Sequence, residues 1–181
     1  EFSKSANKFK DYRTGRDGIS AGIYFTDEIF NEFGSGIADP TAIRDFISYA
    51  FYNWEIKPKY VLLWGDGHYD FKNITTSKPN YIVTYQSKAY SDTFEATRSY
   101  TSDDYFVQVA GNDVFIDLAI GRITIESDEE GNWMAEKIRI YENESSDDQW
   151  RTIVTLMADD APQGNVLDVF DADSHTNQSA Q

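Results

Sequence analysis

Cysteine is absent from the 181 residues of this chain. This polypeptide alone therefore supplies no disulfide, no thiolate metal site and no thiol nucleophile. Long apolar runs are also missing, because the longest, Tyr60 to Trp64, has about five residues and a membrane-spanning helix needs about 20. We expect no membrane-spanning segment. The first residues are charged and polar and show no signal-peptide pattern, which leaves a mature or trimmed chain open.

Basic residues are scarce: 16 Lys and Arg face 31 Asp and Glu, which gives a formal net charge of −15. Phosphate binding depends on Lys and Arg, so we expect no nucleic-acid partner. An acidic surface has three interpretations, namely solubility, a basic partner, or divalent cations. Because 40% of the residues are hydrophobic and 15% are aromatic, the chain can bury a core. We expect one folded domain, or most of one.

Short apolar, β-prone runs alternate with helical patterns along the chain. The runs predict strands at Ala21–Phe25, Tyr60–Trp64, Phe115–Ile125 (interrupted near Gly121) and Arg151–Met157. The Tyr60–Trp64 run is continuously apolar, as in a strand that is buried on both faces of a parallel sheet. Helices are predicted from Thr26 to Phe33, from Asp39 to Trp54 and from Asp128 to Glu144. This order predicts an α/β domain with a mainly parallel sheet.

Carboxylates cluster near the ends of these strands, where functional groups of α/β sheets collect. The clusters are Asp66 with Asp70, Asp113 with Asp117, and Asp159 with Asp160. Hard oxygen ligands from several loops suit Ca²⁺, although no EF-hand spacing is present. Asp in turns more often accepts local hydrogen bonds, so both interpretations stay open on the residues alone.

The two histidines, His68 and His175, do not lie in a recognisable catalytic motif. A histidine at a strand end can act as a general base, yet no G-x-S-x-G nucleophile motif is present. A structural role for His68 is one interpretation. A self-contained metal-dependent hydrolase that uses His68 with Asp66 and Asp70 is another.

Several blocks of sequence together resemble the gingipain-like cysteine peptidases of family C25. Their order and spacing carry the resemblance, and they run from about residue 15 to residue 162. The blocks are Gly36–Phe46, Tyr49–Trp54, Tyr60–Asp70, Ser102–Tyr105, Gly111–Asp113, Asp117–Arg122, Ile140–Glu142 and Ala158–Asp160. Within the family they are most similar to the PorU-like branch, the type IX secretion sortases of Bacteroidetes.

The resemblance implies a caspase-like, three-layer α/β/α fold with a mainly parallel sheet. It also implies a Cys–His dyad, in which a thiolate attacks the peptide carbonyl of a protein substrate. In the family, the catalytic cysteine and histidine both lie C-terminal to all the sequence blocks given above. Neither His68 nor His175 matches the catalytic histidine. Residues 1–162 are therefore expected to be the N-terminal part of a peptidase domain that is inactive alone. Residues 163–181 are expected to be an acidic, polar tail that continues into a missing C-terminal half.

The resemblance further implies a calcium site and an orienting acid. Asp159 stands where the family has the acid that orients the catalytic histidine, with Asp160 as the alternative. A second calcium site and the specificity pocket fall near Asp171, Asp173 and His175, which stay unassigned. The implied Ca²⁺ ligands are Asp66, the carbonyl of Ala110, Asp113, the carbonyl of Phe115 and Asp117.

The expected location is extracellular or at the outer-membrane surface of a bacterium, and the expected partners are a protein or peptide substrate and the missing half of the domain. The alternative is a non-catalytic cell-surface scaffold or binding domain that keeps a gingipain-like fold.

Overall fold

The computed structural model describes residues 2–70, 72, 74–75, 77–87, 100–111, 113–143 and 152–154. The chain divides into two units, Glu1–Asn143 and Glu144–Gln181, and in the second unit only residues 152–154 are described. The first unit contains all the helices and strands discussed below.

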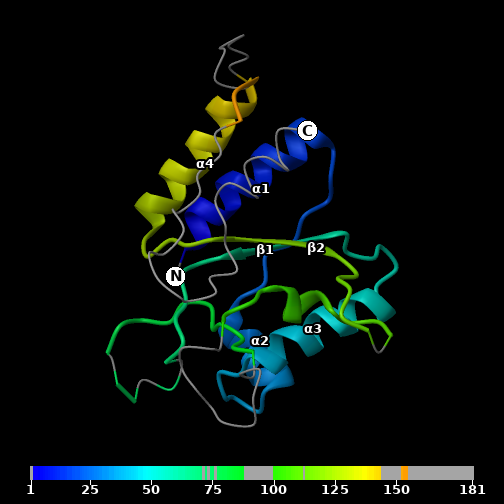
Figure 1. Ribbon diagram of the computed structural model, residues 1–181. Coiled ribbons are helices and arrows are strands. Elements are labelled where there is room, and N and C mark those ends of the chain that lie inside the picture. Colours follow the sequence, from blue (N-terminus) through cyan, green and yellow to red (C-terminus); the bar gives the residue numbers. More distant parts are fainter. Residues whose placement is uncertain are drawn as a thin grey trace, which may run out of the picture. The chain divides into compact units, whose positions relative to one another are not determined.

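The first unit contains four α-helices, one short 3₁₀ helix and two strands within its described residues (Figure 1). In chain order they are α1 (Ser3–Asp17), α2 (Thr26–Phe33), α3 (Pro40–Asn53), β1 (Tyr60–Trp64), η1 (Asp104–Val107), β2 (Ala119–Ile123) and α4 (Asp128–Asn143). The strands pair in parallel, with Tyr60 opposite Ala119 and Trp64 opposite Ile123. Among the described helices, none has the length and apolar character needed to cross a bilayer.

Helices cover both faces of the two-stranded sheet. α2 and α3 contribute Ile29, Ile43 and Ile47 to the core cluster that contains Leu63 of β1. On the other face, Phe9 of α1 stacks on Trp64 with 5.2 Å between ring centroids, and α4 packs against α1. Figure 1 shows these two helix pairs on opposite sides of the strands. The predicted three-layer α/β/α arrangement with a parallel sheet is therefore confirmed.

The start of α3 follows its sequence signals closely. Asp39 has extended backbone angles and its Oδ1 accepts a hydrogen bond from the backbone N–H of Thr41 at 2.6 Å. Pro40, which lacks an N–H, occupies the first helical position, where no partner is needed. The apolar spacing then buries Ile43 and Ile47. The predictions for α2, α3 and β1, and for α4 up to Asn143, are confirmed within a residue or two.

Of the strand predicted at Arg151–Met157, only residues 152–154 are described, and they form no strand. Two strand predictions in the first unit also need correction. Residues 21–25 form no strand, because Tyr24 packs its ring against Phe46 and Trp54, 5.0 and 5.3 Å away between centroids, instead of pairing with a neighbour. The strand predicted from Phe115 begins only at Ala119, because the preceding residues close a loop. Gly121 does not interrupt it, since it pairs with Leu62 inside an unbroken ladder.

The prediction that β1 is buried on both faces is also wrong. Tyr60 is 70% exposed and Leu62 is 43% exposed, whereas Leu63 is 5% exposed. Leu63 points into the α2–α3 side. On the other face, the α1 side chains Ser5 and Phe9 contact Trp64 at the carboxyl end of the strand, whereas Tyr60 and Leu62 stay exposed.

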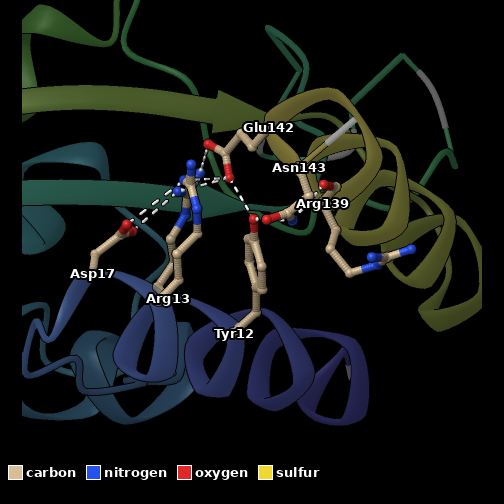
Figure 2. A network of polar contacts seen from close by, with 7 residues as sticks. Tyr12, Arg13, Asp17, Arg139, Glu142 and Asn143 are labelled. Atoms are coloured by element: carbon tan, nitrogen blue, oxygen red, sulfur yellow. Dashed lines mark hydrogen bonds and ion pairs between the residues drawn. The ribbon is translucent and has the colours of Figure 1, made fainter. Parts of the chain in front are cut away.

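Helix α1 has no counterpart in the sequence predictions, because polar contacts rather than an apolar stripe hold it. Ser5 is fully buried, accepts a hydrogen bond from Trp64 Nε1 at 3.0 Å, and donates its backbone N–H to Asp128 at 2.9 Å. At the other end of the helix, Tyr12 and Arg13 both donate to Glu142 of α4 (Figure 2).

The charges at this second contact favour the ionised form of Glu142. Burial alone would raise the pKa of its carboxyl. Hydrogen bonds from Tyr12 and Arg13, and the charges of Arg13 and Arg16, outweigh that effect and lower the pKa. For Tyr12, burial and the hydrogen bond to Glu142 raise the pKa of the phenol.

Candidate functional site

The loop that follows β1 carries the first group of predicted site residues. It extends the sheet, because the backbone N–H groups of Gly65 and Asp66 donate to Ile123 and Ile125, each at 2.9 Å. Asp66 then accepts through its carbonyl from the backbone N–H groups of residues 81 and 82. A Cβ on Gly67 would collide with the carbonyl oxygen of Ile82, so only glycine allows this close approach.

Arg122 of β2 anchors this loop through hydrogen bonds from its guanidinium. Its guanidinium donates to both carboxylate oxygens of Asp103, at 2.9 and 2.8 Å, and its side chain is only 10% exposed. The same guanidinium donates to the carbonyls of Ile82 at 2.9 Å and Gly65 at 3.3 Å. We call Gly65–Gly67, residues 80–83, Asp103 and Arg122 the Arg122 platform. It lies at the carboxyl ends of β1 and β2.

The carboxylate of Asp66 is paired with a lysine. Lys78 Nζ lies 3.5 Å from Asp66 Oδ2 and 2.7 Å from Glu126 Oε1. The hydrogen bond to Glu126 and the charges of Glu126 and Asp66 raise the pKa of the Lys78 ammonium. The cluster therefore carries two carboxylates and one ammonium.

His68 and Asp70 serve the backbone of the loop. His68 Nδ1 accepts from the backbone N–H of Asp70 at 3.2 Å, so the ring proton is assigned to Nε2, which lies 3.0 Å from the carbonyl oxygen of Lys78. The carboxylate of Asp70 is buried and accepts from the backbone N–H groups of Ile74 and Thr75 and from the Thr75 hydroxyl. These contacts favour the structural interpretation of His68 over a catalytic one.

Asp113 and Asp117 belong to a second loop, which precedes β2. The backbone N–H of Asp117 donates to Val107, and Asp117 Oδ2 accepts from the N–H groups of Val109 and Ala110, each at 2.8 Å. Asp113 Oδ1 accepts from the N–H of residue 115 at 3.0 Å. Within the described residues, the carbonyl oxygens of residues 110 and 115 accept no hydrogen bond. This short loop thus carries two carboxylates and two carbonyls to which the described residues supply no hydrogen-bond donor, and hard oxygens of this kind are the ligands that calcium prefers.

Asp66 lies at the other end of the paired strands from that loop. It follows the carboxyl end of β1, whereas Asp117 precedes the amino end of β2. The five paired residues between them span about 13 Å. Calcium ligands lie about 2.3–2.6 Å from the metal, so two ligands of one ion lie within about 5 Å of each other, which is much less than this span. In the part of the chain that the structure describes, no group of three or more His, Cys, Asp or Glu is arranged to hold a metal.

The remaining predicted positions lie outside the described residues. They are Asp159 and Asp160, the candidates for the orienting acid, and the unassigned Asp171, Asp173 and His175. The pairing of Arg122 with Asp103 was not foreseen. Both residues fall in blocks that resemble the family, but their separation of 19 positions suggests no contact by itself.

Comparisons with known proteins give one family and one fold. The chain resembles a crystal structure of dimeric latent PorU from Porphyromonas gingivalis, with a TM-score of 0.65 and 23% identity over 84% of this chain and 16% of that one. It also resembles the complex of RgpB pro- and mature domains from the same organism, with a TM-score of 0.51 and 20% identity over 77% of this chain and 26% of that one. This chain thus matches about a quarter or less of the length of each neighbour. No curated protein matches the chain.

At these identities the two structures establish the fold alone. The family model described as peptidase family C25 matches residues 1–181, the whole length of the chain. It agrees with the resemblance carried by the sequence blocks. The chain therefore belongs to peptidase family C25.

Proposed function

We propose that this chain is the N-terminal part of a cysteine endopeptidase domain, and that the whole protein is a secreted sortase that processes type IX secretion signals at the bacterial cell surface. The observation that carries the proposal is the Arg122 platform. It joins two family-like blocks, around Asp103 and Arg122, at the carboxyl edge of a parallel sheet. That edge is where α/β enzymes place functional groups.

The chain supplies a scaffold and the rest of the protein supplies the chemistry. Cysteine-peptidase chemistry needs a thiolate nucleophile and a histidine that handles protons. No cysteine occurs in these 181 residues, so the nucleophile must come from other sequence. The Arg122 platform fixes the ends of β1 and β2, and strands added to the same sheet would present the reactive side chains beside it. The chain alone is therefore inactive, and its partners are a protein substrate and the remainder of its own domain.

We also propose that a calcium ion stabilises the loop before β2. Asp113, Asp117 and the carbonyls of residues 110 and 115 would hold it there. The backbone N–H groups that bind Asp117 already fix the direction of one carboxylate. The ion would supply charge neutralisation for an exposed acidic loop and would take no part in peptide cleavage.

The deciding experiment uses the full-length protein and a peptide that carries a type IX secretion signal. We expect cleavage that iodoacetamide abolishes, with the alkylated cysteine identified by mass spectrometry in sequence outside this chain. The 181-residue chain, assayed in parallel, should not cleave. Cleavage that survives alkylation, or cleavage by the chain alone, would show the mechanism to be wrong. A full-length protein that does not cleave the peptide at all would support the alternative of a non-catalytic surface domain.

A further inference from the structure

Lys78 bridges two carboxylates that extend beyond the two strands. Its Nζ lies 2.7 Å from Glu126 and 3.5 Å from Asp66. Asp66 comes shortly after β1 and Glu126 comes shortly after β2, so each strand delivers one carboxylate to the ammonium. The bridge therefore ties together the carboxyl ends of the sheet.

The backbone around Lys78 is fixed to the same loop. Its carbonyl oxygen lies 3.0 Å from His68 Nε2, and Asn80 Nδ2 donates to the carbonyl of His68 at 2.9 Å. The carbonyl of Asp66 accepts from the backbone N–H of Tyr81 at 3.1 Å. The ammonium is thus brought to Asp66 by a segment that is anchored at Lys78 itself and at the residues that follow it.

The other oxygens expected to share a calcium ion with Asp66 lie past the opposite end of the strand pair. Calcium takes six to eight oxygen ligands. Among the described residues, the carboxylate that shares Lys78 with Asp66 is that of Glu126, and both carboxylates are already neutralised in part by the ammonium.

We propose that Asp66 is not a calcium ligand in this protein, and that the Lys78 ammonium is the built-in cation of an Asp66–Glu126 pair. The charge that a metal would supply at this end of the sheet is covalently attached to the chain. This inference does not depend on whether the loop that contains Asp113 binds calcium.

The geometry also predicts how the two carboxylates would behave without the Lys78 ammonium. Because both carboxylate oxygens contact one nitrogen, they lie no more than about 6 Å apart. Two oxygens bound to the same Ca²⁺ lie at most about 5 Å apart. A shift of about 1 Å would therefore allow the pair to share an ion once Lys78 no longer occupies the space between them.

The test compares Lys78→Met, which keeps the aliphatic stem, with Lys78→Arg, which keeps the charge. The probe is CaCl2, read out as binding stoichiometry by calorimetry and as the calcium-dependent change in Tm. We expect Lys78→Met to bind one more Ca²⁺ than the unmodified protein, whatever number the unmodified protein binds. Lys78→Arg and the double variant Lys78→Met/Asp66→Asn should gain none.

Two results would overturn the inference. One is a loss of bound calcium when Asp66→Asn is made in the otherwise unmodified protein. The other is no gain of calcium in Lys78→Met. If Lys78→Met unfolds in EDTA, the inference requires that millimolar Ca²⁺ restore its folding, and failure of that rescue also contradicts it. None of these outcomes depends on peptide cleavage, so they are separate from the test of the proposed function.

Discussion

Arg122 and Asp103 form a two-point ion pair in which one guanidinium meets both oxygens of one carboxylate. The remaining N–H groups of Arg122 donate to backbone carbonyls, so the buried charge has partners in several directions. The pair connects β2 to the entrance of η1 and to the loop after β1. Its geometry makes it a determinant of stability at the candidate site.

Replacement of Arg122 by Met should destabilise the protein by about 2–3 kcal/mol, because it takes the guanidinium donors away from Asp103 and from three backbone carbonyls. Urea unfolding measures the effect. Arg139→Met is the matched control, since Arg139 pairs with Glu136 on the surface of α4 with side chains 45% and 41% exposed. That change should cost less than about 1 kcal/mol. Equal losses for the two variants would contradict the structural importance of Arg122.

Gly131 of α4 lies directly against Ser5 of α1. A Cβ at this position would lie 2.7 Å from Ser5 Cβ and 3.0 Å from Ile125 Cδ1. Gly131→Ala should therefore destabilise by about 1–3 kcal/mol through overpacking. Gly15→Ala in α1 is the control, because nothing lies within 4 Å of its Cβ position. It should stabilise by about 0.5–1 kcal/mol through helix propensity. Thermal unfolding distinguishes the two signs.

The contact between Ser5 and Asp128 should make stability depend on acid pH. The backbone hydrogen bond from Ser5 lowers the pKa of the Asp128 carboxyl below its ordinary value of 3.8. A lowered folded-state pKa contributes stability above about pH 3.8, and that contribution is lost as the pH falls through the lower, folded value.

The measurement is the free energy of unfolding between about pH 2 and pH 6. Asp128→Asn should be less stable than the unmodified chain at the upper end of this range, and the two should converge at the lower end. Glu129→Gln, an exposed change on the same turn, should leave the profile in place. A constant difference between Asp128→Asn and the unmodified chain at every pH would contradict the assignment.

Calcium should raise Tm relative to EDTA if the loop before β2 binds it. An ion that binds only the folded state stabilises by about 2.7 kcal/mol at a hundred times its Kd. Asp113→Ala should abolish the shift, because it removes one of the two carboxylates in that loop. Asp66→Asn should retain the shift, because Asp66 lies at the far end of the strands. A shift that disappears in Asp66→Asn would place the ion elsewhere.

Much of the sheet and its inner helices could be read from the sequence, because the information there is local. The apolar spacing after Asp39 defines α3, and the run Tyr60–Trp64 defines β1. Helix α1 could not be found in this way. Its only two buried residues are Ser5 and Phe9, and the partners that bury them lie far along the chain.

The predicted calcium ligands divide between two ends of the strands for a topological reason. All the acidic clusters were expected near strand ends, but the two ends of a parallel strand are not equivalent. Asp66 follows its strand and Asp117 precedes the next one. Parallel pairing therefore sends them to opposite edges. The order of residue and strand in the sequence contains this information, whereas the ammonium of Lys78 beside Asp66 required the structure.

The contacts between α1 and α4 have a consequence for the order of events during translation. Ser5 and Asp128 are 123 positions apart, and Tyr12 and Glu142 are 130 apart. At about 5–20 residues per second, the first helix leaves the ribosome roughly ten seconds before its partner exists. During that interval α1 has no packing surface from α4, and its basic side chains face the medium. The nascent chain must therefore finish about three quarters of this segment before its first helix can dock.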